Sequence, residues 1–237
     1  SSTWRELKAV HTALLSFAPV IKGKMVKLHT DNQGVVAISA KGSMNLELQN
    51  IAVDIFNVCK RFSISLEVQW IPRTENQEAD YLSRLIDFDD WGVSRPFFDF
   101  MNSLWGPYSV DRFADPINAK MGKFNSKFWC PGTAQVDAFS LDWSSDNNWL
   151  VPPISAIPAV LRHIKVCKAQ GTLVVPMWPS SPFWPLLFSQ QSDFKDLVKF
   201  CIQFTDTSNI FVQGRNMNST FGSKFFTSKV MCIRLQG

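Results

Sequence analysis

The sequence predicts an α/β fold, because segments with the apolar period of a helix alternate along the chain with segments that have the period-two alternation of a strand. Up to residue 85 the predicted order is helix, strand, two helices, strand, helix, which indicates parallel α/β construction. Helices and strands alternate again after residue 107, and no internal repeat relates the two halves. The 237 residues are therefore expected to form two units, and a hydrophobic content of 46% is ample for their cores.

The elements of the first half follow from local patterns. An amphipathic helix is predicted over residues 3–17, and the alternating segments 22–30 and 64–72 are predicted strands. A further helix over residues 74–85 has Thr74 at its N-cap position, since threonine side chains accept hydrogen bonds from the first turn of a helix. The two remaining helices are predicted over 33–42 and 45–62.

The second half begins after an acidic and aromatic stretch, residues 87–107, which is interpreted as a connector. Residues 108–237 have strand and helix patterns that indicate a second α/β unit. Its strands are predicted around 108–115, 147–153, 172–178, 209–214 and 229–235, and its helices over 155–169 and 194–204.

Composition excludes several classes of protein. A net charge of +4, divided evenly between the halves, permits nucleic-acid binding but does not by itself indicate it. The five cysteines are widely spaced and form no CxxC pair, so neither a disulfide framework nor a zinc ribbon is indicated. No apolar run approaches the roughly 20 residues that span a bilayer, and no signal-peptide pattern leads the chain. We therefore expect an intracellular protein, cytoplasmic or nuclear, without a membrane segment.

Three acidic residues are placed where a catalytic site could form. Asp31 follows the first predicted strand, and sites in parallel sheets form outside the carboxyl ends of strands. Glu6 lies in the first turn of the first helix, and Asp80 lies within the last helix of this half. Carboxylates that converge repel one another unless a cation is present, and all-oxygen ligands favour Mg²⁺ or Mn²⁺. One interpretation is therefore a two-metal site that hydrolyses a phosphodiester.

Each acid also has a purely structural interpretation. Thr3 and Glu6 have the spacing of a capping box, in which the glutamate helps to close the start of a helix. Asp31 could form a turn or cap the next helix, and Asp80 could be a solvated helix charge. From the residues alone, the structural and the catalytic interpretations both stay open.

Five short motifs occur in a defined order in the first half. They are Arg5-Glu6-Leu7 with Ala9, Thr30-Asp31-Asn32, Trp70-Ile71-Pro72-Arg73, Asn76, and Ala79-Asp80-Tyr81-Leu82-Ser83-Arg84. Their order and spacing resemble the RNase H domain of retroelement reverse transcriptases, in particular that of DIRS-type elements, which carry a tyrosine recombinase. The resemblance implies a ribonuclease that cuts the RNA strand of an RNA:DNA hybrid with two Mg²⁺ ions, or Mn²⁺, held by four carboxylates.

The resemblance also implies roles for single residues. Glu6, Asp31 and Asp80 match the second, third and fourth catalytic, metal-binding carboxylates of the family. The implied partners are an RNA:DNA hybrid or another nucleic acid, and an upstream reverse transcriptase in the same polyprotein. Contacts to the nucleic acid are expected from Asn32, Arg73, Asn76 and Arg84.

The chain departs from the family at its start. In the family, three antiparallel strands precede the first helix, and the first of them carries the first catalytic Asp, whereas this sequence begins with the helix. Residues 1–86 are therefore expected to form a truncated RNase H-like domain, in which the strand over 22–30 has an unpaired edge. Whether the chain is an enzyme is left open, and by itself it is expected to be inactive.

The second half carries a different set of motifs. They are Val110-Asp111-Arg112-Phe113-Ala114, Asn118-Ala119-Lys120, Asp142-Trp143, Val151-Pro152-Pro153-Ile154, and Leu173-Val174-Val175-Pro176 with Trp184. In this order they resemble the phage-type, Dam-like adenine methyltransferases, and the resemblance implies a Rossmann-like domain over residues 108–237.

The methyltransferase signature is degenerate in this chain. The family holds the adenine with an Asn or Asp and an aromatic residue, whereas this chain has Val151 and Ile154 at those positions. Asp111 is a candidate cofactor-binding acid, but no glycine-rich loop follows it, so S-adenosylmethionine is not expected as a cofactor. Three functions stay open: an RNase H-type ribonuclease segment, a non-catalytic nucleic-acid-binding or assembly module of a retrotransposon polyprotein, and an S-adenosylmethionine-dependent DNA adenine methyltransferase.

Overall fold

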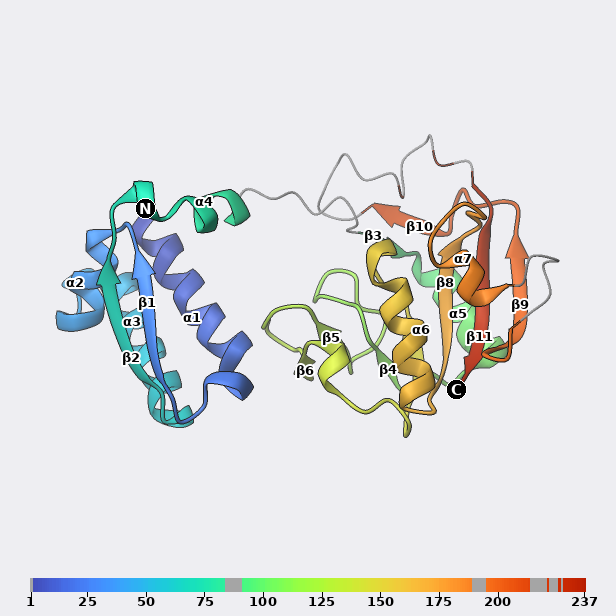
Figure 1. Cartoon of the computed structure of the whole chain (residues 1–237), viewed down its shortest axis with the longest axis horizontal. Coiled ribbons are helices and arrows are strands. Elements are labelled where there is room, and N and C mark those ends of the chain that lie inside the picture. The colour runs from blue at the N-terminus through green and yellow to red at the C-terminus, as the bar shows by residue number, and fades with distance from the viewer. Residues whose placement is uncertain (1, 84–90, 189–194, 214–220, 222–225, 227) are drawn as a thin grey trace. The chain divides into compact units, whose positions relative to one another are not determined.

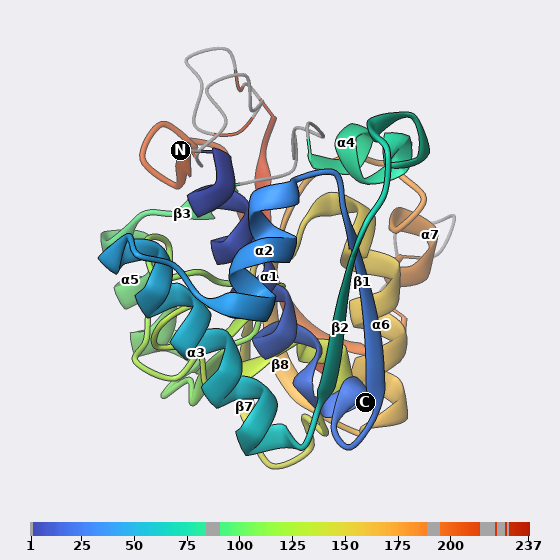
Figure 2. The same ribbon diagram turned by 90° about the vertical axis from the view of Figure 1, so that its left-hand side faces the viewer.

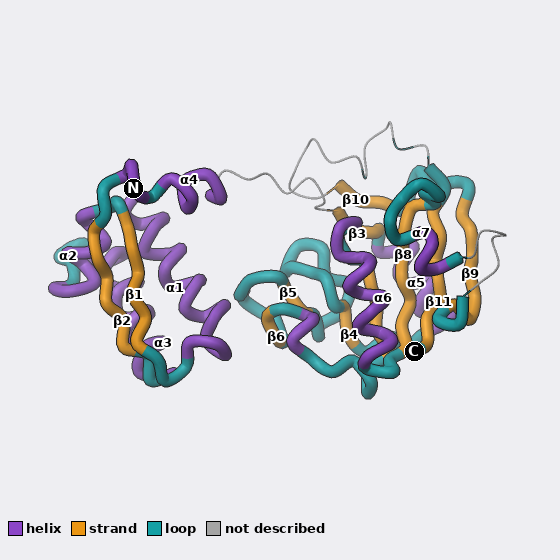
Figure 3. Tube along the Cα trace, viewed as in Figure 1, coloured by secondary structure: helices purple, strands orange, loops and turns teal. Residues whose placement is uncertain are grey.

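The chain divides into two compact units, Ser1–Leu85 and Ile86–Gly237 (Figure 1). Both units combine helices and strands, which confirms the predicted α/β class (Figure 3). The computed structural model describes residues 2–83, 91–188, 195–213, 221, 226 and 228–237.

The first unit is built around a pair of parallel strands. Its elements are α1 (Ser2–Ile21), β1 (Met25–Thr30), α2 (Gln33–Lys41), α3 (Leu46–Phe62), β2 (Ser65–Trp70), the 3-10 helix η1 (Arg73–Glu75) and α4 (Gln77–Ser83). In the register of the strands, Met25 lies opposite Ser65 and Thr30 lies opposite Trp70, so the parallel arrangement is confirmed. Both strands therefore end at the same edge of the sheet.

One face of the strand pair packs against α1 and α3 (Figure 2). Along β1, Val26 and Leu28 contact this core, while Lys27 between them is exposed, as expected for a strand with one covered face. Among the described residues, β1 and β2 pair only with each other. The buried core residues are Leu7, Val10, Leu14, Val35, Ile51, Ile55, Val58 and Ile64.

Capping interactions set the bounds of several helices. The Asn45 side chain accepts a hydrogen bond from the Leu48 N–H at 3.2 Å, so α3 begins at the next residue. At its other end, Ser63 takes a left-handed conformation with a φ of 53°, which stops the helix. In the second unit, Ser94 caps the first turn of α5 by accepting from the Phe97 N–H at 3.3 Å.

Two helix ends differ from the prediction. The helix predicted over 3–17 continues through Pro19 and ends at Ile21. Thr74 is not an N-cap: it lies inside η1, where the Glu75 N–H donates to the Pro72 carbonyl at 2.8 Å. The following helix therefore begins only at residue 77.

The second unit has one main sheet with the order β4-β7-β8-β11-β9 among the described residues. β4, β7 and β8 run parallel, and β11 is antiparallel to both of its neighbours. Two small sheets, β3 with β10 and β5 with β6, complete the strand pairing of the described part. The elements are β3 (Trp91–Val93), α5 (Arg95–Trp105), β4 (Val110–Asp111), β5 (Asn125–Ser126), β6 (Gln135–Val136), η2 (Ala138–Ser140), β7 (Asn147–Leu150), η3 (Ile154–Ala156), α6 (Ile157–Val166), β8 (Gln170–Pro176), α7 (Trp184–Leu187), β9 (Val198–Phe204), β10 (Phe211–Gln213) and β11 (Val230–Gln236).

Helices cover both faces of this main sheet. Alternate residues of β8, which is buried beyond its first residue, point to opposite faces, as the strand period requires. Leu173 and Val175 pack with α6 in one core cluster, whereas Val174 packs with α5 in the other. The second unit is therefore a three-layer structure with the sheet in the middle.

The stretch predicted as a connector, 87–107, contains β3 and α5 instead. Phe98 of α5 is 3% exposed and packs edge-to-face on Trp149, with 5.2 Å between the ring centroids. Met101, one turn further on, is fully buried in the same cluster. The described part of this stretch therefore belongs to the core of the second unit, because its aromatic residues cover one face of the main sheet.

The helix predicted over 194–204 is also wrong, because residues 198–204 form β9. This segment alternates apolar and other residues with period two, and it is rich in the aromatic and β-branched side chains that favour strands. Its pairing with β11 satisfies the backbone hydrogen bonds that a helix would have made internally. No described helix of either unit is long and apolar enough to span a bilayer.

The role of α5 in the core can be tested with two matched substitutions. Phe98→Ala should lower the unfolding free energy of the second unit by about 3–5 kcal/mol, because it leaves a cavity beside Trp149. Phe100→Ala is the control: this side chain is 51% exposed, so we expect a loss below about 1 kcal/mol. Urea unfolding measures both values, and equal losses would mean that α5 is not a core element.

Candidate active site

The Glu6 carboxylate joins the start of α1 to the end of β1. Its Oε2 accepts a hydrogen bond from the Thr30 hydroxyl at 3.0 Å, and its Oε1 accepts one from the Asn32 side-chain amide, also at 3.0 Å. A carboxylate has about four lone-pair positions, so each oxygen of the half-buried Glu6 keeps the capacity for a further ligand. The side chain is therefore held in one orientation, and some of its lone-pair positions stay open for a ligand.

Asn32 has two structural roles at this point. Its Oδ1 caps α2 by accepting from the Gly34 N–H at 2.9 Å, while its amide nitrogen donates to Glu6. Its own backbone N–H donates to the Thr30 hydroxyl at 3.1 Å. Asn32 thus orients Glu6, and its expected contact with nucleic acid stays a prediction.

Thr30 is a site residue that sequence reasoning missed. The side chain is 6% exposed and both donates to Glu6 and accepts from Asn32. A threonine at the buried end of a strand usually indicates only β-propensity, so nothing local reveals a contact with a residue 24 positions earlier. The available signal was its place directly before the motif's acid, Asp31.

Asp31 lies just beyond the carboxyl end of β1, as predicted. Its side chain is half-buried and has no hydrogen-bond or ion-pair partner among the residues described. The Asp31 backbone carbonyl, in contrast, accepts a hydrogen bond from the indole N–H of Trp70 at 3.2 Å. The backbone is thus held from the neighbouring strand while the carboxylate stays available.

Asp80 lies on α4, beyond the carboxyl ends of β1 and β2 (Figures 1 and 2). Its Oδ1 is 3.8 Å from the Arg73 guanidinium, and its backbone N–H donates to the Asn76 carbonyl at 3.1 Å. Arg73 and Asn76, both expected to contact nucleic acid, therefore lie close to Asp80 in the fold. Arg84 lies outside the described residues.

Glu6 accepts hydrogen bonds from Thr30 and Asn32, the two residues that flank Asp31 in the sequence, and Asp80 is not joined to Glu6 and Asp31 in one ligand set. Within the described parts of the chain, no three His, Cys, Asp or Glu side chains are grouped closely enough to hold a metal ion. The capping-box prediction is wrong, since Thr3 lies inside α1 and the Glu6 oxygens accept from other residues.

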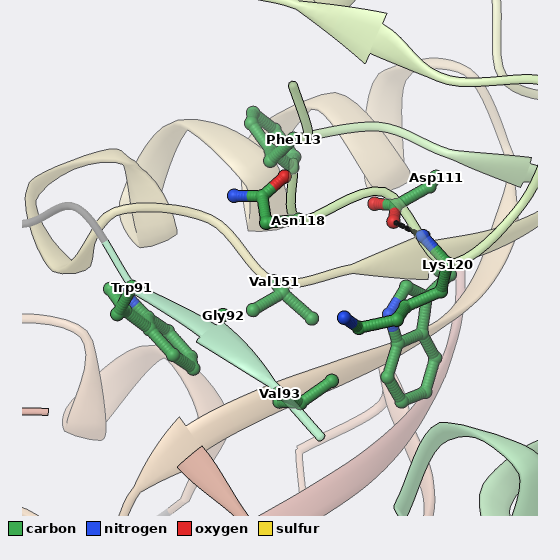
Figure 4. A pocket seen from close by; sticks show the side chains of 9 residues that line it. Trp91, Gly92, Val93, Asp111, Phe113, Asn118, Lys120 and Val151 are labelled. Carbon is green, nitrogen blue, oxygen red and sulfur yellow. Dashed lines mark hydrogen bonds between the residues drawn. The ribbon is translucent and has the colours of Figure 1, made fainter. Parts of the chain in front are cut away.

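Asp111 ends β4 in the second unit and is almost completely buried, with 3% exposure. Its Oδ2 accepts from the Lys120 backbone N–H at 3.2 Å, whereas its Oδ1 has no hydrogen-bond partner in the part of the chain that the structure describes. Burial raises the pKa of Asp111 to about 6, against the opposing effect of nearby backbone N–H groups. The residue lines a small cavity, open to solvent, together with Lys120, Trp91 and Val151 (Figure 4).

Arg112, the next residue, is buried and fully partnered. Its guanidinium donates to Asn148 at 2.7 Å and to Asn125 at 3.0 Å, and it forms an ion pair with Asp146 at 2.7 Å. Asn148 is itself buried and donates to the Gln170 carbonyl at 2.7 Å. This network links β4, β5, β7 and β8. Its polar groups bind one another, so they are not available to hold a ligand.

The first unit is similar to a known protein family. Residues 1–86 match a family model described as reverse transcriptase-like. The match supports a retroelement RNase H-like domain in the first unit. A domain of this kind implies nucleic-acid binding, in agreement with the expected partner class. No curated protein matches the chain.

The coupling of Glu6 to Thr30 predicts a stability effect. Thr30→Val should lower the unfolding free energy of the first unit by about 1–3 kcal/mol, because it removes a hydrogen bond to a charged group. Urea unfolding followed by the NMR signals of residues 2–83 measures this loss. The control is Thr74→Val on the exposed surface of η1. A loss of the same size there would mean that the loss in Thr30→Val does not come from the hydrogen bond to Glu6.

Asp111 predicts a pH dependence of the second unit. Its folded pKa of about 6 lies above the ordinary value of 3.8, so the folded state binds the proton more tightly than the unfolded state does. The unit should therefore gain stability, on the order of 3 kcal/mol, as the pH falls from 7 through 6 towards 4.

Urea unfolding at pH 7 and pH 5 tests this dependence. Asp111→Asn should remove it, because the amide has no charge to bury, whereas Asp99→Asn on the exposed side of α5 should leave it unchanged. A gain on acidification that persists in Asp111→Asn would assign the effect to another group.

Proposed function

We propose that the first unit is an RNase H-type ribonuclease segment that acts on the RNA strand of RNA:DNA hybrids. The observation that carries this proposal is the placement of Glu6 and Asp31 at the carboxyl end of β1, with Glu6 oriented by two hydrogen bonds. The reverse transcriptase-like match over residues 1–86 supports the same proposal. The carboxyl ends of parallel strands are also where ligands bind in α/β folds.

The donor set of this edge suits Mg²⁺ or Mn²⁺. Mg²⁺ in phosphoryl-transfer sites is usually held by one or two carboxylates together with waters and substrate phosphates. Glu6 keeps free lone pairs on both oxygens, and Asp31 has no partner in the described part of the chain, so these two residues would hold the ion. When bound, paired divalent ions would activate water and stabilise the leaving oxygen of the phosphodiester.

Asp80 is proposed as the third carboxylate of the same site. Its contact with Arg73 is long, at 3.8 Å, and both side chains are substantially exposed, so solvent and salt weaken the attraction between them. Because Asp80 is not grouped with Glu6 and Asp31 in the described structure, it would have to leave Arg73 and approach them to join the ion when a nucleic acid is bound. Arg73 would then be released to meet a phosphate, the role for which an exposed guanidinium is suited.

We further propose that this unit works within a longer retroelement polyprotein of the DIRS type, beside an upstream reverse transcriptase. The family's site has four carboxylates, and Glu6, Asp31 and Asp80 account for three of them. A fourth carboxylate from outside these 237 residues would complete the site. The chain by itself should therefore bind hybrids but cut them poorly.

The second unit is proposed to be a Dam-like, Rossmann-type domain without methyl-transfer activity. Val151 lines the cavity beside Asp111, where a methyltransferase would need a polar group for the adenine. Asn148, the nearest amide in the sequence, is buried and already donates to three backbone carbonyls. Neither residue can hold a base in the described arrangement.

Binding and cleavage assays test the proposal for the first unit. In Mg²⁺, the 237-residue chain should bind an RNA:DNA hybrid more tightly than duplex DNA of the same sequence, as measured by fluorescence anisotropy. Asp31→Asn should remove the Mg²⁺-dependent part of this affinity, because it removes one ligand charge. Asp54→Asn, an exposed carboxylate on α3, is the matched control and should behave as the wild type does.

The outcomes separate the candidate functions. Cleavage that appears when the upstream polypeptide is added, and is lost in Asp31→Asn, supports the ribonuclease. Tight hybrid binding without cleavage in the longer protein would favour a non-catalytic nucleic-acid-binding module. Robust Asp31-dependent cleavage by the 237-residue chain alone would contradict the proposed need for a fourth carboxylate.

A further inference from the structure

Trp70, the last residue of β2, leaves a large part of its indole in solvent. Its exposed fraction is 47%, although a tryptophan side chain gains more than most from burial. β1 and β2 are parallel and in register, so Trp70 lies directly opposite Thr30, next to Asp31. An exposed aromatic side chain is therefore present at the same sheet edge as the candidate carboxylates.

The indole is also fixed in position. Its N–H donates to the Asp31 carbonyl at 3.2 Å, and the following backbone N–H, that of Ile71, donates to the Thr30 carbonyl at 2.9 Å. A side chain held at both its backbone and its polar tip has little conformational entropy left to lose on binding. The ring face that remains exposed is thus preorganised for a contact.

A basic residue, Arg73, lies on the segment that follows β2. The Arg73 side chain is 73% exposed, and Pro72, with a φ of −65°, fixes the short path between it and Trp70. Aromatic faces beside basic groups are the combination with which proteins hold nucleic-acid strands, the ring packing on a base or sugar and the cation meeting a phosphate.

We propose that Trp70 forms a packing surface for one strand of the bound nucleic acid, with its indole face against a sugar and Arg73 at the adjacent phosphate. This inference rests on the proposed function, because the strand concerned is that of an RNA:DNA hybrid. It adds a contact residue to the carboxylates and assigns the two ends of the indole to different tasks. The ring binds the strand, and the N–H holds the backbone of Asp31.

Hybrid binding by the full 237-residue chain tests the proposal. Trp70→Ala should weaken the affinity for a blunt RNA:DNA hybrid about 5- to 100-fold, the range measured when stacking side chains are removed. Trp70→Phe keeps an aromatic face without the N–H and should stay within about threefold of the wild type. Phe56→Ala is the matched control, since Phe56 is 65% exposed on α3, and it should not change the affinity.

The salt dependence provides a second readout that a purely structural role would not affect. Arg73→Gln should reduce the slope of log affinity against log salt by about one, whereas Trp70→Ala should lower the affinity without changing that slope.

Three results would overturn the inference. If the wild type binds the hybrid and Trp70→Ala binds equally well, the inference fails and the proposed function stands. If Trp70→Phe keeps its fold, as judged by thermal unfolding, but loses as much affinity as Trp70→Ala, the ring face is not the contact. If the wild type does not prefer the hybrid over duplex DNA, the proposed function fails and this inference fails with it.

Discussion

The hydrogen bonds that Glu6 accepts from Thr30 and Asn32 are the constraint on which the candidate site depends. They join the first helix to the end of the first strand, and because Asn32 also caps α2, three elements meet at one carboxylate. Hydrogen bonds to charged groups contribute about 1.5–3 kcal/mol each. The same bonds leave lone pairs on both oxygens, so holding the fold together and binding a cation do not compete for the same positions.

Two neighbouring residues in the second unit differ in whether all their polar atoms have hydrogen-bond partners. This difference separates a structural group from a candidate ligand group. Arg112 is buried with a partner on each guanidinium nitrogen, and it therefore acts as a link between strands. Asp111 is buried with one oxygen unpartnered, a state that costs free energy and raises its pKa. In the first unit, the Asp31 side chain likewise has no partner within the described ranges, but it is only half-buried and reaches solvent.

Local patterns predicted the element order of the first unit and the position of Asp31, because both depend on periodicity and on where parallel strands end. They could not predict the contact of Thr30 with Glu6, which arises only when the helix packs on the sheet. Nor could they place the aromatic residues of α5, whose burial depends on a sheet formed by later segments. The apolar residues of β9 fit both the helix and the strand period, so the sequence predicts a helix there, and only the pairing with β11 decides for the strand.

The central claim is that Glu6 and Asp31 share a divalent-cation site at the end of β1. A titration of the isotope-labelled chain with Mn²⁺, followed by amide NMR, tests it directly, because the paramagnetic ion broadens the signals nearest to it. We expect the first broadening in residues 3–7 and 30–34, and its loss in the Glu6→Gln, Asp31→Asn double variant. Broadening centred on exposed acids elsewhere, such as Glu47 and Asp54 of α3, and unchanged in the double variant, would contradict the claim.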